Sequence, residues 1–177
     1  MKLKSNIMDE AAVMRAVKRI AFEIEEKNKG FENVCLIGIH RRGVSLANMI
    51  AAFIKKNENI DLPVGSVDIT MYRDDRLKND SKIPTDKQSV DFDINGKSVI
   101  LVDDVIYTGR TVRAAIDAVF CFGRPSRIQL AVLIDRGHRE LPIRPDYIGK
   151  NIPTSSAEEV KVSVPEYDGE TRADIYM

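Results

Sequence analysis

The feature that most limits the fold of this chain is the stretch at residues 99–111, VILVDDVIYTGRT, where an apolar run ends in two carboxylates and a polar loop. The apolar run at 99–102 predicts a strand that is buried on both faces, as in a parallel sheet. Gly109 allows a tight turn after it. Apolar residues at helical spacing over 112–120 predict a helix directly after the loop. The stretch therefore indicates a strand–loop–helix unit of an α/β protein.

The loop in this unit carries groups that suit a phosphorylated sugar. Asp103 and Asp104 can accept hydrogen bonds from sugar hydroxyls, whereas their charge repels phosphate. Thr108 and Thr111 offer hydroxyls, and the N-terminus of the following helix is a phosphate site. Open α/β sheets bind ligands at the carboxyl ends of their strands. An ordinary turn is the alternative, and the paired aspartates argue against it. The two better-known phosphate loops, the P-loop and G-x-G-x-x-G, are absent from the sequence.

Residues 99–111 resemble the signature of the type I phosphoribosyltransferases, which bind phosphoribosyl pyrophosphate (PRPP). The resemblance implies that the acidic pair holds the ribose 2′- and 3′-hydroxyls and that the loop wraps the 5′-phosphate. It implies a type I phosphoribosyltransferase core, a mostly parallel twisted sheet flanked by helices, with a mobile hood loop. The alternation of strands and helices favours the same α/β class. The implied PRPP or UMP contacts here are Asp103, Asp104, Val105, Ile106, Tyr107, Thr108, Gly109, Arg110 and Thr111.

A second strand–loop–helix unit precedes the first. Residues 34–39 form a short apolar run, and residues 44–54 have helical spacing. Between them Arg41 and Arg42 offer paired donors and positive charge for a diphosphate. In the family that the chain resembles, this loop holds pyrophosphate. His40 either contacts the pyrophosphate or is a plain polar loop residue.

The remaining elements are expected from periodicity and turns. Residues 9–28 predict an amphipathic helix that stops at Gly30, and its basic face is either solvated or a surface for a polyanion. Alternation over 67–71 predicts a half-exposed strand. Further strands are expected at 128–134, 147–152 and 160–164. Without a repeat or linker, residues 1–177 are expected to form one phosphoribosyltransferase-like domain.

The polar stretch 77–89 is too long for an ordinary loop in a compact domain. The resemblance implies that it belongs to the hood loop, which closes over the reactants and excludes water. The alternative is a disordered hairpin tip. The segment just before it supplies Arg73 and Asp74, which we expect to be catalytic together with the acidic pair.

Composition excludes some classes and leaves others open. The 177 residues include 27 basic and 27 acidic side chains, so net charge alone does not favour nucleic acid. Cys35 and Cys121 lie in apolar surroundings, which predicts buried thiols and no disulfide. No signal peptide or long apolar span is present in the sequence, so a cytoplasmic protein without membrane contact is expected.

Three further segments, 68–75, 129–144 and 146–154, resemble the family of pyrimidine operon attenuation regulators that are also uracil phosphoribosyltransferases. The resemblance implies the reaction of uracil with PRPP to give UMP and diphosphate. It also implies binding of leader mRNA, dependent on UMP or UTP, which promotes transcription termination. Homodimers that pair into homotetramers are implied. The implied RNA contacts, on a basic dimer face, are Lys18, Arg19, Lys27, His138, Arg139, Arg144 and Lys150.

In the family that the chain resembles, several members carry other residues at the positions of Lys18 and Phe22. Phe22 either stacks on an unpaired base or contributes only to helix packing. For catalysis, the resemblance implies Mg²⁺ carried by PRPP, with no ligand directly from the protein. It also implies uracil contacts from Arg136 and the backbone near Val160. The acceptor of the uracil N1 proton is left open between Asp103, Asp74 and water.

Two other functions are compatible with the PRPP signature. One is a salvage phosphoribosyltransferase for uracil, hypoxanthine or guanine without an RNA role. The other is a regulator that senses PRPP or nucleotides without turnover. An acidic phosphoacceptor site of the receiver type is disfavoured, because the Thr-Gly-Arg-Thr loop at 108–111 directly follows the aspartates.

Overall fold

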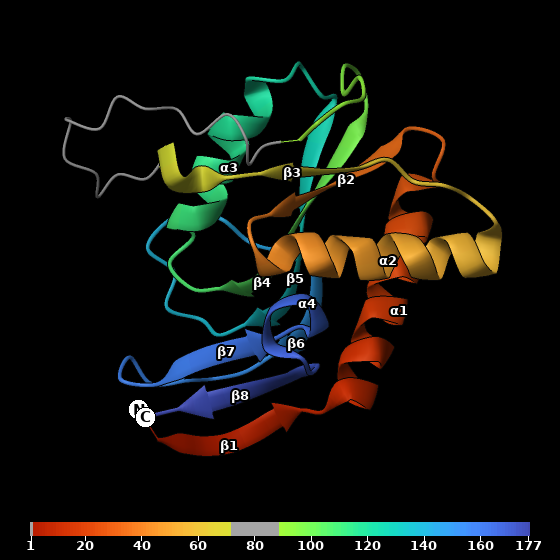
Figure 1. The fold of residues 1–177 in the computed structure, drawn as a ribbon. Coiled ribbons are helices and arrows are strands. Elements are labelled where there is room, and N and C mark those ends of the chain that lie inside the picture. Colours follow the sequence, from red (N-terminus) through yellow and green to blue (C-terminus); the bar gives the residue numbers. More distant parts are fainter. Residues whose placement is uncertain (1, 72–88) are drawn as a thin grey trace.

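The computed structural model describes residues 2–71 and 89–177, which form two sheets flanked by helices (Figure 1). A parallel sheet has the strand order β3-β2-β4-β5-β6, and an antiparallel sheet has the order β1-β8-β7. The strands are β1 Leu3–Met8, β2 Val34–Ile39, β3 Val64–Val67, β4 Ser98–Ile106, β5 Arg127–Asp135, β6 Tyr147–Asn151, β7 Glu159–Ser163 and β8 Arg172–Tyr176. The helices are α1 Glu10–Asn28, α2 Arg42–Glu58, the 3₁₀ turn η1 Ile69–Met71, α3 Arg110–Phe120 and α4 Pro165–Asp168.

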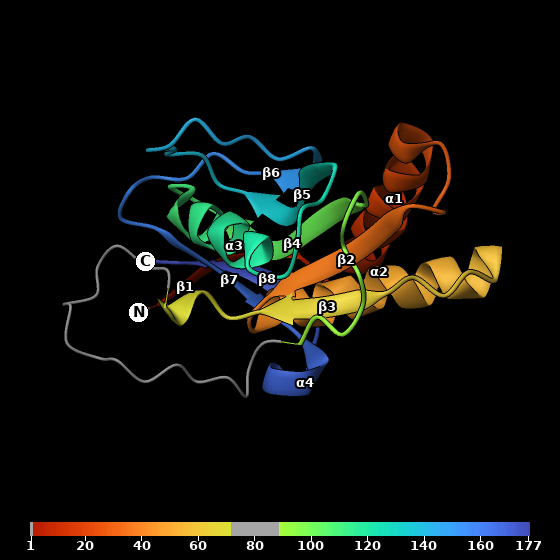
Figure 2. The ribbon, with the colours of Figure 1, turned by 90° about the horizontal axis from the view of Figure 1, so that it is seen from above.

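Helices cover both faces of the parallel sheet, α1 and α2 on one face and α3 on the other (Figures 1 and 2). Alternate residues of β2 serve the two layers: Leu36 packs in the cluster beneath α1 and α2, whereas Cys35 and Ile37 pack in the cluster beneath α3. All six residues of β2 are buried. The expected two-sided burial of the apolar strands is therefore confirmed.

Helix α1 confirms the prediction for residues 9–28 almost residue for residue. Asp9 is its N-cap, and the Asp9 carboxylate accepts a hydrogen bond from the Ala12 N–H at 2.8 Å. The predicted stop at Gly30 is one residue late, because Lys29 already takes the left-handed conformation, with φ 57°. The Gly30 N–H then donates to the Glu25 carbonyl at 2.9 Å, which satisfies one of the last carbonyls of the helix.

Strand β4 is longer than its sequence suggests. The expected loop after residue 102 is wrong at its start, since the strand continues to Ile106 and both aspartates belong to it. The cause is the neighbouring β5, which stays in parallel register alongside, with Asp103 opposite Val132 and Val105 opposite Ile134. Backbone pairing thus overrides the polar character of the two carboxylates.

The expected strand over 67–71 is also wrong beyond its first residue. Strand β3 ends at Val67, and a 3₁₀ turn follows. The Asp68 carboxylate accepts a hydrogen bond from the Thr70 N–H at 2.9 Å, a local turn that competes with strand pairing. The proposed catalytic residues Arg73 and Asp74, and residues 77–88 of the expected hood loop, lie outside the described residues.

The antiparallel sheet was not expected from the sequence. Strands β1 and β8 pair near the two termini, which lie side by side in Figure 1. Asp174 on β8 is buried, and its carboxylate accepts a hydrogen bond from the Asn6 side-chain amide at 2.9 Å. Strand β1 is exposed over most of its length and shows little apolar alternation, which is why periodicity missed it. Over residues 2–71 and 89–177, no helix is both long and apolar enough to span a bilayer.

Gly43→Ala is expected to lower the free energy of unfolding by about 3 kcal/mol, because overpacking against rigid backbone is costly. A Cβ atom at Gly43 would lie 2.3 Å from the carbonyl oxygen of Val102 on β4. The matched control is Gly96→Ala, whose Cβ meets nothing within 4 Å and whose only cost is its φ of +70°. Urea unfolding followed by circular dichroism measures both, and equal losses would contradict the close approach.

Candidate active site

The carboxyl ends of β2, β4 and β5 lie side by side in parallel register and bring three segments to one edge of the sheet. The segment after β2 contains the paired arginines, the segment after β4 contains Gly109, and residues 136–144 follow β5. The two phosphate-binding units expected from the sequence thus share this edge. This is the position at which open α/β sheets bind ligands.

The acidic pair lies at the carboxyl end of β4. Asp103 is buried and Asp104 is half-buried, and the Asp104 N–H donates to the Asp103 carboxylate at 2.9 Å. Burial, reinforced by the neighbouring charge of Asp104, holds the pKa of Asp103 well above its usual range. Burial also raises the pKa of Asp104, against the lowering effects of hydrogen bonds and of the positive charge on Arg42. Two carboxylates in this setting favour partners that donate hydrogen bonds or carry positive charge.

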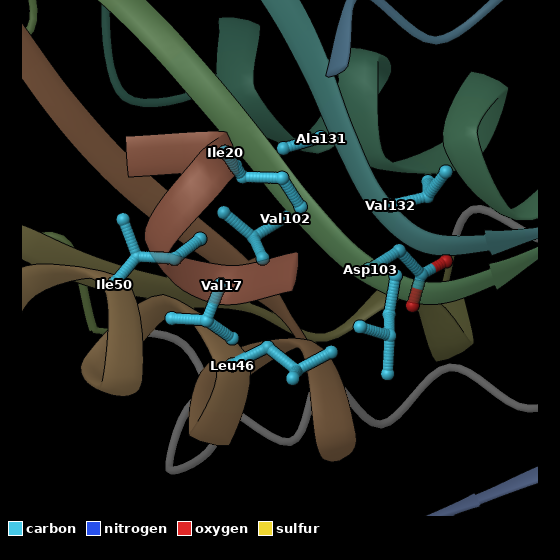
Figure 3. A pocket seen from close by; sticks show the side chains of 9 residues that line it. Val17, Ile20, Leu46, Ile50, Val102, Asp103, Ala131 and Val132 are labelled. Atoms are coloured by element: carbon cyan, nitrogen blue, oxygen red, sulfur yellow. The ribbon is translucent and has the colours of Figure 1, made fainter. Parts of the chain in front are cut away.

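A small cavity lies next to the part of β4 that carries Asp103. It has room for about 10 Å³ and is lined by side chains from α1, α2, β4 and β5. The carboxylate of Asp103 is the one charged group among the side chains labelled in Figure 3. A space of this size accommodates at most one water molecule, so a sugar phosphate has to lie outside it, on the open edge of the sheet.

Residues 107–109, the predicted phosphate loop, lead from β4 into helix α3. Gly109 is the N-cap residue with φ 94°, a left-handed conformation that favours glycine. The Arg110 N–H lies 3.4 Å from the Thr108 hydroxyl, and the Arg113 N–H donates to the Gly109 carbonyl at 3.0 Å. The amide groups of Thr111 and Val112, between these two, therefore stay available to an anion.

The loop after β2 presents its two arginines differently. The peptide bond between His40 and Arg41 is cis, and the Arg41 side chain is exposed. Arg42 begins α2, and its guanidinium forms an ion pair with Asp168 of α4 at 3.1 Å. The two arginines, equivalent in the sequence prediction, thus occupy distinct environments.

The segment 136–144 folds back onto the phosphate loop. The N–H groups of Glu140 and Leu141 both donate to the Thr108 carbonyl, at 3.0 and 3.1 Å. The Arg139 guanidinium donates to the Tyr107 carbonyl at 2.8 Å. No pattern in the sequence predicts these contacts, because two of them are made by backbone N–H groups.

Arg136, a predicted uracil contact, is buried, and its guanidinium holds the loop before β7. It donates to the Ser155 carbonyl at 3.1 Å and to the Glu158 carbonyl, and it lies 4.1 Å from the centre of the Tyr107 ring. Val160, the other predicted contact, is buried in β7. Uracil contacts at both residues stay predictions.

The seven residues predicted to bind RNA fall into two groups. Those on α1 and β6 meet across the seam between these elements: Arg19 donates to the Gly149 carbonyl, and Lys27 pairs with Asp146 at 2.5 Å. Lys150 donates to the Ile7 carbonyl at 2.9 Å. Lys18 and Arg144 are exposed. The second group, His138, Arg139 and Arg144, belongs to segment 136–144, in which Arg139 donates to the Tyr107 carbonyl.

Phe22 is 52% exposed on α1. Its ring makes an edge-to-face contact with Phe53 of α2, with centroids 5.4 Å apart. The Lys18 ammonium lies 6.0 Å from the centre of the same Phe53 ring. Phe22 therefore packs between the helices and still exposes half of its surface.

Comparisons with known proteins agree with this geometry. Residues 4–168 match the phosphoribosyl transferase domain family. The chain is 61% identical over 166 residues to the bifunctional protein PyrR of Acetivibrio thermocellus, covering 94% of this chain and 90% of that protein. It is 53% identical over 176 residues to the bifunctional protein PyrR of Thermus thermophilus, covering 99% and 97%.

Solved structures support the fold alone, because their sequence identities are low. A hypoxanthine-guanine phosphoribosyltransferase from Bacillus anthracis superposes with a TM-score of 0.72 at 22% identity and covers 100% of both chains. A hypoxanthine phosphoribosyltransferase from Staphylococcus aureus gives a TM-score of 0.71 at 17% identity, covering 99% of this chain and 92% of that one.

Asp103→Asn is expected to stabilise the protein at pH 8. Because folding raises the pKa of Asp103, stability is highest below the ordinary aspartate pKa and is lost as the pH rises through the raised value. The neutral amide removes this loss and keeps an oxygen for the Asp104 N–H. We expect a gain of at least about 1 kcal/mol at pH 8, since one pKa unit is worth about 1.4 kcal/mol, and little gain near pH 4.

Urea unfolding at the two pH values measures this difference. Asp91→Asn is the control, because it makes the same change of side chain at an exposed position. A wild-type protein more stable than Asp103→Asn at pH 8 would refute the burial argument.

Proposed function

The chain belongs to the bifunctional PyrR family of phosphoribosyltransferases, and we propose that its two functions are catalysis of UMP synthesis and regulation through RNA. In the first, uracil reacts with PRPP to give UMP and diphosphate. In the second, the protein with UMP or UTP bound attaches to the leader of pyrimidine biosynthetic mRNA and promotes termination. The observation that carries the proposal is the meeting of a buried acidic pair and an anion-binding helix N-terminus at one sheet edge.

The acidic pair and the phosphate loop would hold the two ends of the ribose. Asp103 and Asp104 accept hydrogen bonds from the 2′- and 3′-hydroxyls, which suits carboxylates that burial has deprived of water. Thr108, Thr111 and the amide groups that open α3 bind the 5′-phosphate. Contacts to both ends fix C1 for attack without touching the reacting bond.

Departure of diphosphate leaves positive charge on the ribose and negative charge on the leaving group. Arg41 and Arg42 stabilise the leaving group, and the carboxylates of Asp103 and Asp104 favour the charge that develops on the sugar. Arg73 and Asp74 complete the proposed catalytic set. The uracil N1 proton passes to Asp103, Asp74 or water.

Magnesium fits this arrangement as a companion of PRPP. The ion would be held by the phosphate and hydroxyl oxygens of PRPP, which are hard ligands of the kind that Mg²⁺ prefers, and would have no ligand directly from the protein. Within residues 2–71 and 89–177 no cluster of three or more His, Cys, Asp or Glu forms a cage for a metal. When bound, Mg²⁺ would neutralise charge on the diphosphate.

Uracil would lie between the phosphate loop and the loop before β7. The backbone near Val160 offers hydrogen bonds to the base. Arg136 supports this wall, since its guanidinium binds the carbonyls of Ser155 and Glu158. A base held by backbone groups in this way would be selected by shape and by hydrogen-bond pattern.

The regulatory half of the proposal rests on the contact between segment 136–144 and the phosphate loop. His138 and Arg139 belong to the predicted RNA surface, and Glu140 and Leu141 bind the carbonyl of Thr108 directly. A nucleotide phosphate on this loop would therefore act on the position of both basic side chains. We include a homodimer, pairing into a homotetramer, and a cytoplasmic location in this proposal. A salvage enzyme without an RNA role is not favoured.

The double variant Asp103→Asn with Asp104→Asn should lose UMP formation by at least about 10³-fold, because the diol loses both charged partners and the sugar cation loses its favourable field. Release of diphosphate in the presence of uracil measures turnover. Circular dichroism verifies the fold, which should be kept because each amide retains an oxygen for the neighbouring N–H. Turnover like that of wild type would discard the proposed role of the pair.

Arg144→Ala should weaken binding of pyrimidine-leader RNA in the presence of UMP about fivefold or more, because an exposed phosphate contact is lost. UMP synthesis should be unchanged. Lys56→Ala is the matched control, since Lys56 is an exposed basic residue in the last turn of α2, outside the proposed surface. Gel-shift titration measures the affinity. Equal weakening by both variants would indicate a general charge effect and count against the proposed surface.

A further inference from the structure

Arg42 and Asp168 connect the two sheets at the candidate active site. Arg42 opens α2, which follows strand β2 of the parallel sheet, whereas Asp168 ends α4, which joins β7 to β8. One guanidinium nitrogen of Arg42 lies 3.1 Å from one carboxylate oxygen of Asp168 and 3.2 Å from the other. Figure 1 shows α4 beside the beginning of α2.

Asp168 is itself fixed. Its carboxylate accepts a hydrogen bond from the Val164 N–H at 3.0 Å, and its own N–H donates to the Val164 carbonyl at 2.9 Å. Burial raises its pKa, but the Val164 N–H and the Arg42 charge outweigh this and hold the pKa below its usual range. The carboxylate is therefore a charged and firmly held partner for Arg42.

The guanidinium group of Arg42 does not pair all of its N–H donors. Its Nε atom is buried and has no hydrogen-bond partner among the described residues. An unpaired buried donor is costly, so the other contacts of the side chain must hold it there. Its charge also acts on Asp104, whose pKa it lowers. The next residue, Gly43, would place a Cβ atom 3.2 Å from the Cα atom of Asp103, so the start of α2 lies against the strand that carries the acidic pair.

We propose that Asp168 is a positioning residue for the transferase reaction, which holds Arg42 beside the acidic pair in the arrangement that receives the diphosphate of PRPP. The inference rests on the proposed function, and it adds Asp168 of α4 to the residues that serve the reaction. Asp168 does not touch the substrate. It acts through Arg42, whose long side chain would otherwise lose rotamer freedom each time PRPP binds.

Calorimetric titration of Mg²⁺–PRPP into wild type and Asp168→Asn tests the inference, with steady-state kinetics alongside. The asparagine keeps an oxygen for the Val164 N–H and removes the charge. We expect the Kd and the KM for PRPP to rise about tenfold, which is about 1.4 kcal/mol, while the KM for uracil and the melting temperature stay near wild type. Glu166→Gln is the matched control, because it removes the same charge from an exposed position of α4.

A double-mutant cycle with Arg42→Ala separates a positioning role from a structural one. If Asp168 acts through Arg42, the tenfold effect of Asp168→Asn disappears in the Arg42→Ala background. Equal effects in both backgrounds, or a Kd for PRPP like that of wild type, would overturn the inference. If Asp168→Asn does not fold, Asp168→Ser, which also offers an oxygen to the Val164 N–H, takes its place.

If the proposed function itself is wrong, the experiments give a different pattern of results. Wild type would then form no UMP, and the titration alone would decide the inference. Tighter binding of PRPP by wild type than by Asp168→Asn would support it, and equal binding or no binding would refute it.

Discussion

The candidate site is organised around two adjacent carboxylates near the end of the central strand β4, of which Asp103 is buried and Asp104 is half-buried. Taking Asp103 out of water is costly, and the charge on Asp104 adds to the cost. The surroundings offset only part of it, through backbone N–H groups and the charge of Arg42. A strand buried on both faces, paired on both sides and covered by three helices can carry this unfavourable feature. Carboxylates in this environment favour partners that donate hydrogen bonds or carry positive charge.

Close approach of backbone to backbone sets the positions of the parts around this pair. Gly43 lets the start of α2 come against the Val102 carbonyl, and Gly38 lets β2 approach Val44 equally closely. Arg42 is thereby brought to the edge of β4, within reach of Asp168 on α4. Side chains larger than hydrogen at these glycines would separate the loop after β2 from the acidic pair. Small residues next to charged ones are therefore part of the chemistry of the site.

The core was accessible from the sequence because its signals are local. Apolar runs such as 34–39 and the helical spacing over 9–28 predict core strands and α1, and the fold and family are confirmed. The pairing between strands that are far apart in the chain could not be predicted from the sequence. Register with β5 extended β4 through Asp103, and β1 carries too little apolar pattern to predict its pairing with β8. The site was foreseen as two loops on one edge, whereas the Arg42–Asp168 pair joins residues far apart in the chain and has no local signature.

The contact of segment 136–144 with the phosphate loop has a particular chemical character. Its acceptor is the main-chain carbonyl of Thr108, and two of its donors are the amides of Glu140 and Leu141. Replacing any of these side chains leaves the contact intact, so scanning mutagenesis would pass over it. Only a change to the main chain itself, such as an ester in place of the amide at Leu141, removes one donor without altering a side chain. Substitution of these side chains can accordingly change the chemistry of the surface while the main-chain connection beneath it stays in place.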